Sequence, residues 1–335
     1  MKPLNIAIFT IGSALAGAAG AFSLDVREVH GYFERSIDAR SRIPFLDGSE
    51  PIHERLTDQT LECEKQASLC ERLQAIGIQA ADIREGVRSN DFPAQYLDSQ
   101  AVPWCKNRVL RISIDGDVAC ILGSFVRASE SREKFGDQSW ANARPFGMRG
   151  HFGDLQFLHS MAPEGQEASA TYAGVLMWME FSYRASRDEF DLRSDAYAVK
   201  VAGMKRHFVR GARKVGDLFN YRFTKGQVRG VALGQMLHIA QDSFAGCHTE
   251  RNKDGAMLRF FSYAQQKTSE HSKYDKDPDK TQAALSGPLT PVLFGKELLE
   301  LRIANREWHE VVPLIDKYLR PVDGSVRAIA GAHCR

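Results

Sequence analysis

Residues 168–186 read ASATYAGVLMWMEFSYRAS, a segment that is apolar nearly all round for part of its length. A helix of that composition is buried on most sides, as the central helix of a bundle is. Apolar residues at helical spacing predict four further helices, over Asp25–Arg40, Glu54–Ile76, Gln227–Phe244 and Phe294–Tyr318. We therefore predict an all-α fold, mainly a helical bundle.

Two segments depart from the helical pattern. LRISIDGDVACIL (110–122) places β-branched residues on both sides of Asp115-Gly116, which is typical of a β-hairpin. Lys267–Pro291 is polar and rich in Lys, Asp, Ser and Pro, so we expect a long loop, and such loops are often functional. No internal repeat or domain linker is evident. We expect residues 22–335 to form a single domain with a small β-hairpin excursion.

The overall composition is that of a soluble globular protein. The 335 residues are 43% hydrophobic and 26% charged, and the formal net charge is only +2. Electrostatic binding to nucleic acid depends on a basic excess, which this chain lacks. The composition therefore weighs mildly against a nucleic-acid partner.

The N-terminus has the pattern of a cleavable signal peptide. Lys2 precedes an almost uncharged apolar run, Leu4–Ala16, and Ala19-Gly20-Ala21 supplies small residues for cleavage after Ala21. A buried N-terminal helix is the alternative. No other stretch approaches the ~20 apolar residues of a membrane span, so we expect no transmembrane segment. Phe22 would then begin a mature protein that is secreted or periplasmic.

Six cysteines fit an oxidising compartment and permit up to three disulfides. On one continuous helix, Cys63 and Cys70 would lie two turns apart, about 10 Å by helical rise, which is too far to bond. A local turn between them, or other partners, would be needed. None of the cysteines shows C-x-x-C spacing, so we interpret them as structural rather than as metal ligands.

Three potential metal ligands lie in HIAQDSFAGCH (238–248). His238 and Asp242 are four residues apart, so on a helix both side chains leave the same face. His248 follows a stretch where the helix can bend or end, and Cys247 beside it is better suited to a disulfide. Imidazole and carboxylate are the usual zinc ligands outside thiolate sites. A single His–Asp pair is also typical of a surface or capping interaction.

Further histidines and carboxylates extend this pattern along the chain. Asp137 precedes His151 by fourteen residues, and His271 and Asp275 repeat the H-x3-D spacing in the polar loop. His30 lies eight residues after Phe22, whose α-amino group becomes a potential ligand once the signal peptide is cut.

This order resembles the zinc-dependent phospholipase C family, α-helical secreted enzymes related to the fungal single-strand-specific nucleases. The resemblance spans Phe22–Asp275 and implies three zinc ions in a cleft between helices. By the resemblance, one zinc would be held by Asp137, His151, His238 and Asp242. A second would be held by His248, His271 and Asp275. The third would be held by Phe22 through its amino and carbonyl groups, by His30 and by the shared Asp242.

Several of these positions have alternatives. His159 competes with His151, Asp277 or Asp279 with Asp275, and His30 could be a surface residue of the first helix. The basic cluster Lys205–Lys214 is interpreted as a solvated helix face, with membrane-surface contact as the alternative. The remaining histidines fit no ligand spacing and are interpreted as structural: His53, His207, His309 and His333.

Clustered zinc ions suit hydrolysis of phosphate esters, because two close metals polarise phosphoryl oxygens, activate water and stabilise the leaving oxygen. The resemblance gives Asp137 a catalytic role as general base or as the group that orients the water. The G-x-S-x-G motif of serine lipases is absent. We therefore expect direct attack by water rather than a covalent intermediate.

The substrate class is indicated by the residues before His248. Nuclease relatives carry Gln-Pro-Leu there, whereas this chain has Phe244-Ala245-Gly246-Cys247, closer to the bacterial phospholipase branch. We predict a monomeric phospholipase C that acts at a membrane surface on phosphatidylcholine or phosphatidylethanolamine. The alternatives are a zinc nuclease or 3′-nucleotidase using the same metals, and a non-catalytic, metal-stabilised binding module.

Overall fold

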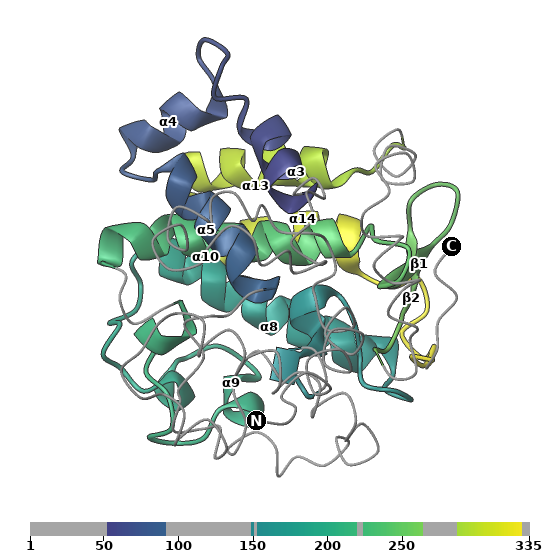
Figure 1. The fold of residues 1–335 in the computed structure, drawn as a ribbon. Helices are drawn as coiled ribbons and strands as arrows, with labels where there is room; N and C mark the ends of the chain where they lie inside the picture. The colour runs from purple at the N-terminus through teal and green to yellow at the C-terminus, as the bar shows by residue number, and fades with distance from the viewer. Residues whose placement is uncertain (1–51, 92–148, 151–152, 220–223, 264–286, 330–335) are drawn as a thin grey trace, which may run out of the picture.

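The computed structural model describes residues 52–91, 149–150, 153–219, 224–263 and 287–329 (Figure 1). These residues are mainly helical, with one two-stranded sheet, which confirms the predicted fold class at that level. The α-helices are α3 (Ile52–Leu61), α4 (Leu69–Ala75), α5 (Ala80–Asp91), α8 (Ala168–Ser186), α9 (Met204–His207), α10 (Lys225–Asp242), α13 (Pro291–Ile303) and α14 (Trp308–Leu319). The 3-10 helices are η5 (Gln156–His159), η6 (Ala196–Ala198) and η7 (Gly216–Leu218).

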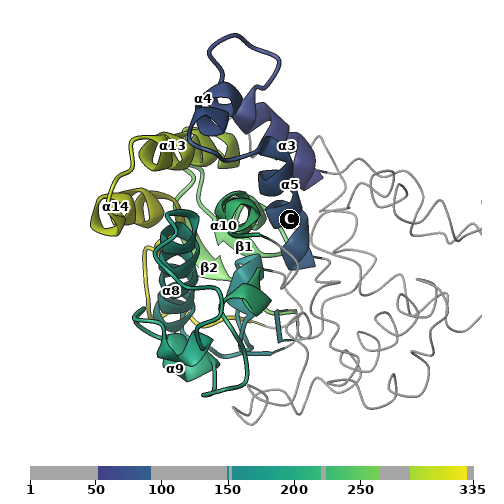
Figure 2. The ribbon, with the colours of Figure 1, turned by 90° about the vertical axis from the view of Figure 1, so that its left-hand side faces the viewer.

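Helix α10 is the centre of the bundle. Figure 2 looks nearly along it and shows α3, α5, α8, α13 and α14 arranged around it. The helix begins with a capping box, in which Thr224 and Gln227 each bond the other's backbone. From Gly230 to Asp242 every residue is buried. The helix that carries two of the predicted ligands is therefore also the most enclosed helix in the described part of the chain.

Helix α8 has the bounds that the sequence predicts. Its apolar side chains, including Trp178 and Phe181, lie in the main core, whereas Ser169 and Ala173 are exposed. Helix α8 is therefore largely buried, as expected. The centre of the bundle is occupied by α10 rather than by α8.

Glycines allow α5 and α10 to pack backbone against backbone. A Cβ atom at Gly234 would lie 2.1 Å from the carbonyl oxygen of Ile83, and one at Gly86 would lie 2.1 Å from the carbonyl oxygen of Val231. Gly230 is equally constrained, because its Cβ would lie 2.5 Å from Cβ of Asp82. Gly230, Gly234 and His238 follow one another at intervals of four residues, so they lie on the same face of α10. We call Gly230 and Gly234 the glycine stripe; the next position on this face is His238, the first predicted ligand of the helix.

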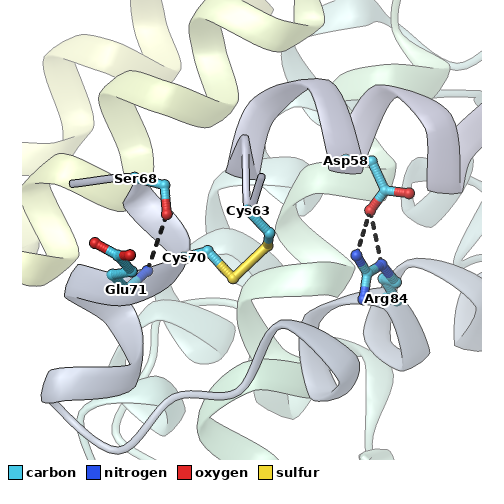
Figure 3. The surroundings of a disulfide bond; sticks show 6 residues. All are labelled: Asp58, Cys63, Ser68, Cys70, Glu71 and Arg84. Atoms are coloured by element: carbon cyan, nitrogen blue, oxygen red, sulfur yellow. Dashed lines mark hydrogen bonds and ion pairs between the residues drawn. A yellow bond between two sulfur atoms is a disulfide. The ribbon is translucent and has the colours of Figure 1, made fainter. Parts of the chain in front are cut away.

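The predicted helix Glu54–Ile76 is two helices. Helix α3 ends before Glu62, whose φ of 48° is left-handed, and α4 begins after Ser68, whose Oγ accepts a hydrogen bond from the Glu71 amide. The turn between them brings the Cα atoms of Cys63 and Cys70 to 5.0 Å, and the two form a disulfide (Figure 3). The local turn that this pairing requires is therefore present.

The predicted helix Phe294–Tyr318 is also split. Helix α13 begins at Pro291, inside the segment predicted as a loop, and Asn305 with a φ of 52° follows its end. Helix α14 then begins with a capping box formed by Glu307 and Glu310. The change of direction packs both helices on the core, which a single straight helix of that length would not do.

A two-stranded antiparallel sheet follows α10. Strand β1 (Thr249–Arg251) pairs with β2 (Met257–Phe260), and Thr249 lies opposite Phe260. This hairpin was not predicted from the sequence, and the hairpin predicted at 110–122 lies outside the described residues. Arg251 donates hydrogen bonds to the carbonyl oxygens of Ser243 (2.7 Å) and Tyr318 (2.9 Å), so it ties the sheet to the ends of α10 and α14.

No helix within the described ranges combines the length and apolar character that spanning a membrane requires. The predicted signal peptide, the predicted helix 25–40 and residues 264–286 of the polar loop lie outside those ranges.

Candidate metal centre

Three predicted ligands converge at the C-terminal end of α10. His238 Nε2 lies 2.9 Å from Asp242 Oδ2, one helical turn away. Helix α10 ends at Asp242, and the turn that follows returns His248, so that its Nδ1 lies 3.7 Å from the same carboxylate oxygen. All three side chains are completely buried. The H-x3-D-x5-H segment therefore forms one compact group rather than a surface ion pair.

Two histidines from other elements join this group. His53 on α3 places Nε2 3.3 Å from Asp242 Oδ1, and His159 at the end of η5 places Nδ1 3.0 Å from Asp242 Oδ2. His159 Nδ1 is also 3.1 Å from His238 Nε2. Asp242 is thus surrounded by four imidazoles, from α3, from η5 and from the segment 238–248. His159 is the alternative that competes with His151, whereas His53 is a residue that the sequence analysis interpreted as structural.

The geometry of this group fits a metal ion. His53, His238 and Asp242 each offer one ligand atom, and these atoms all lie within 4.8 Å of one another. Neutral imidazole nitrogen and carboxylate oxygen form a donor set typical of zinc. This buried group can therefore hold a metal ion.

Hydrogen bonds at Nδ1 fix the ring orientation of three of these histidines, and in His238 and His53 they leave Nε2 facing Asp242. Nδ1 of His238 lies 2.8 Å from the Val87 carbonyl oxygen, and Nδ1 of His248 lies 2.6 Å from the His159 carbonyl oxygen. A carbonyl oxygen only accepts, so both Nδ1 atoms carry the proton and donate. In the neutral rings, Nε2 is then left with a lone pair. An imidazole anchored to an oxygen in this way is typical of metal-binding histidine.

The third anchored ring is His53, which depends on a longer chain of hydrogen bonds. Its Nδ1 lies 2.7 Å from Gln241 Oε1, and Gln241 Nε2 donates to Thr57 Oγ1 at 3.1 Å. The Thr57 hydroxyl in turn donates to the His53 carbonyl oxygen, so it is available to accept from the amide. This chain fixes the orientation of the Gln241 amide, with its oxygen toward His53. His53 Nε2 is therefore the ring atom directed at Asp242.

Burial keeps His53 and His238 neutral. Desolvation lowers the pKa of His238 to about 3. It also lowers the pKa of His53, with a further contribution from the neighbouring His238. At neutral pH the contacts of these two histidines with Asp242 are consequently not ion pairs between a carboxylate and imidazolium. The group presents a negatively charged oxygen ligand and neutral nitrogen ligands, the protonation state that metal binding requires.

The glycine stripe on α10 explains how one of these anchors forms. Val87 lies on α5, and its carbonyl oxygen reaches His238 because α5 and α10 approach within backbone contact at Gly86 and Gly234. A larger residue at either glycine would hold the helices apart and lengthen this bond. Helix packing and ligand orientation are thus two results of the same local sequence.

His53 could have been suspected from its helix. In IHERLTDQTL the buried polar residues His53, Thr57 and Thr60 lie on a helix that also buries Ile52 and Leu56. Polar groups on a buried face need partners, so they indicate either a hydrogen-bond network or a ligand site. Ligand spacing along the chain did not reveal His53 because it comes from a separate helix.

The structure describes Cys247, beside His248, but not the remaining predicted ligands. Cys247 is buried and disulfide-bonded, as predicted, and its partner lies outside the described residues. The predicted ligands whose placement also lies outside them are Phe22, His30, Asp137, His151, His271 and Asp275. The structure therefore addresses one part of the predicted constellation, the part centred on Asp242.

No protein-family model, curated protein or solved structure matches this chain. Assignment of a function therefore depends on the chemistry of the metal centre and on its ligand spacing.

The lowered histidine pKa values predict a pH dependence of stability in the metal-free protein. Between the unfolded pKa of 6.5 and the folded value of about 3, the unfolded state binds more protons at His238. The free energy of unfolding should then fall as the pH drops below 6.5, by a few kcal/mol in total. Urea unfolding in the presence of a chelator, at pH values between about 4.5 and 7, measures this slope.

The variant His238→Gln is the control, because it removes the titrating group from the same position. Carboxylates titrate mainly below this pH range, so the variant should show a clearly shallower slope than the wild type. Equal slopes in the two proteins would contradict a neutral, buried His238.

Proposed function

We propose that this chain is an exported zinc-dependent phospholipase C that hydrolyses glycerophospholipids to diacylglycerol and a phosphorylated head group. The observation that carries the proposal is the convergence of His238, Asp242 and His248 on one buried point. The spacing of these three residues is one part of the order of ligands that resembles the zinc-dependent phospholipase C family. Had the segment been a surface pair, its ligands would have pointed to solvent.

The residues around Asp242 supply the features that phosphate-ester hydrolysis needs. Bound zinc would polarise a phosphoryl oxygen and lower the pKa of a water molecule. Asp242 supplies negative charge to balance the cation, and the Nδ1 anchors of His53 and His238 hold the Nε2 ligand atoms in place. We assign the general base or water-orienting role to Asp137, as the family resemblance implies.

The residues before His248 favour a lipid substrate over a nucleotide, because the chain has Phe244-Ala245-Gly246-Cys247 where nuclease relatives carry Gln-Pro-Leu. A zinc nuclease is expected to place an aromatic side chain beside the metals for base stacking. Phe244 is the aromatic residue within the H-x3-D-x5-H segment, and the Arg251 guanidinium already lies over its ring at 3.9 Å from the centroid. Its face is therefore occupied within the protein, whereas the Tyr263 ring lies beside the centre, with its centroid 5.9 Å from that of His248 and 6.3 Å from that of His159. The same zinc site acting on single strands or 3′-nucleotides remains the second candidate.

Export is part of the proposal. Leu4–Ala16 and the small residues before Phe22 predict signal cleavage, and the Cys63–Cys70 disulfide suits an oxidising compartment. Cleavage would free the α-amino group of Phe22, the ligand that the family resemblance requires. A site with three zinc ions therefore forms only in the mature, exported protein.

Metal analysis together with a substrate panel tests this function. The mature protein should contain about three zinc ions per chain and should hydrolyse phosphatidylcholine vesicles and a soluble short-chain phosphatidylcholine. Phenanthroline should abolish this activity, and added zinc should restore it, because the ligands are arranged for a metal. Single-stranded DNA and 3′-nucleotides complete the panel.

Each other outcome identifies an alternative. Strong cleavage of DNA with inert lipid would establish the nuclease instead. Bound zinc without any hydrolysis would favour a metal-stabilised binding module, and in that case His238→Ala should preserve the biological effect. Activity that is unaffected by the chelator would exclude the zinc mechanism.

A further inference from the structure

A strongly basic loop lies outside the metal centre. Residues 193–214 include seven Lys or Arg residues and one acid, Asp195, so the segment carries a formal charge of +6. The whole chain carries only +2, so the rest of the protein is net negative. This stretch of 22 residues therefore holds an excess of positive charge larger than that of the whole chain. We refer to residues 193–214 as the basic loop.

The basic loop is closed at its base by backbone hydrogen bonds. The Val215 amide donates to the Ser194 carbonyl oxygen and the Ala196 amide donates to the Arg213 carbonyl oxygen, both at 2.9 Å. Asp195 accepts hydrogen bonds from the Gly211 and Tyr197 amides, so its carboxylate is used within the loop. This single acid stabilises the loop and leaves most of the surrounding positive charge unbalanced.

Buried side chains hold the loop against the core and direct its cations outward. Met204 and Phe208 are at most 2% exposed, and both belong to the main hydrophobic core. The exposed cations of the loop are Arg193, Lys200, Lys205, Arg206, Arg210 and Lys214. Val209 lies among them and is itself 39% exposed. The result is an ordered surface with many cations and one apolar side chain.

The basic loop is joined to the segment that carries His159. His207 Nδ1 lies 2.8 Å from Asp154 Oδ2, and Arg149 forms a bidentate pair with the same carboxylate. Arg149 also donates to the His207 carbonyl oxygen at 2.6 Å. Asp154 lies five residues before His159, so the loop is fixed relative to one wall of the metal centre. Figures 1 and 2 place α9, which belongs to this loop, at the opposite end of the molecule from α4.

We propose that the basic loop docks the protein on an anionic phospholipid membrane. Clustered Lys and Arg residues are attracted to the negative surface of such a membrane, and an exposed apolar side chain can enter the interface. The choice of a lipid partner rests on the proposed function, since an enzyme that cleaves phospholipids must work at a membrane. The docking itself requires only the charge and shape of the loop.

The aromatic residues of the loop argue against single-stranded nucleic acid as the partner. Binding of single strands uses exposed aromatic rings on which bases stack. Phe208 is buried, and the Tyr197 ring is covered by Lys205 and Arg210, whose cationic groups lie 5.5 and 5.4 Å from its centroid. Neither ring is available as a stacking platform, whereas Val209 is available for contact with lipid.

Sedimentation with vesicles tests the proposal. The mature protein should bind vesicles of phosphatidylcholine containing about 30% phosphatidylglycerol at least tenfold more tightly than vesicles of phosphatidylcholine alone. Binding should weaken as salt is raised, because the attraction is electrostatic. The variant K200E/K205E/R206E should lose most of this preference, by about tenfold or more.

A second triple variant controls for net charge. K65E/K225E/K253E makes the same charge change at three exposed lysines on other elements, and it should bind vesicles nearly as well as the wild type. Both variants should keep the circular dichroism spectrum and the melting temperature of the wild type, which verifies that they fold whether or not the protein hydrolyses lipid. If the loop variant does not fold, R206E alone, at low salt, provides the same comparison with K253E.

The outcomes separate docking from the proposed function. Equal loss of vesicle binding in the two triple variants, or no preference of the wild type for anionic vesicles, would overturn the docking surface. Loss of single-stranded DNA binding but not of vesicle binding in the loop variant would identify a nucleic-acid surface instead. Vesicle binding that depends on the loop, in a protein that hydrolyses no lipid, would support docking and refute only the phospholipase.

Discussion

Replacing Asp242 by asparagine should remove metal binding almost completely. Asp242 supplies the carboxylate of the group His53, His238 and Asp242, and both of its oxygens face imidazole nitrogens. The amide is nearly isosteric but neutral, so four buried histidines would face a cation without a balancing charge. Loss of an outer hydrogen-bond partner typically costs 10–100-fold in metal affinity, and loss of this ligand should cost more than about 100-fold. Hydrolysis of a soluble phosphodiester should fall with it.

Thermal unfolding with and without zinc measures this effect independently of activity. A ligand at about 100 times its dissociation constant stabilises the folded state by about 2.7 kcal/mol, which appears as a rise in the melting temperature. The wild type should show this rise, and Asp242→Asn should not. Asp254→Asn is the matched control, because Asp254 is exposed in the turn between β1 and β2. An undiminished zinc response in Asp242→Asn would show that the metal binds elsewhere.

The helices of this protein were predictable to different degrees. Helix α8 has the predicted bounds, and α10 differs from its predicted range by two residues at each end, because long apolar periodicity is a strong signal. The helices predicted over 54–76 and 294–318 are each interrupted by a turn in the structure, which divides each of them into two helices. Each break follows from a residue with a left-handed backbone, Glu62 and Asn305. The apolar spacing runs on through both turns, so periodicity does not reveal them.

The metal centre shows a similar division. His238, Asp242 and His248 are close in sequence, so their spacing was enough to predict that they act together. His53 and His159 reach Asp242 from α3 and η5, and their positions depend on packing between elements far apart in the chain. Spacing alone favoured His151 over His159 and gave His53 no role. Tertiary arrangement is what adds both residues to the group.

Replacing Gly234 by alanine should destabilise the fold and weaken the metal centre together. The added Cβ would lie 2.1 Å from the Ile83 carbonyl oxygen and 2.7 Å from Cα of Gly86. Both are backbone atoms of α5, so no side-chain rotation can relieve the clash, and the helices must separate. Overpacking of a core typically costs about 1–3 kcal/mol, and a clash with backbone should lie at or above the upper end. Urea unfolding measures the loss.

The same substitution should reduce zinc affinity although Gly234 touches no metal ligand. Separation of α5 from α10 would lengthen the 2.8 Å bond between Val87 and His238, and an imidazole without its anchor is a poorer ligand. Gly226→Ala on the same helix is the control, because its Cβ would meet only Thr224 Oγ1, at 3.9 Å. That variant should be stabilised by about 0.5–1 kcal/mol, as expected for alanine in a helix, with unchanged zinc affinity. If Gly234→Ala matches Gly226→Ala in both measurements, close packing of α5 and α10 does not orient His238.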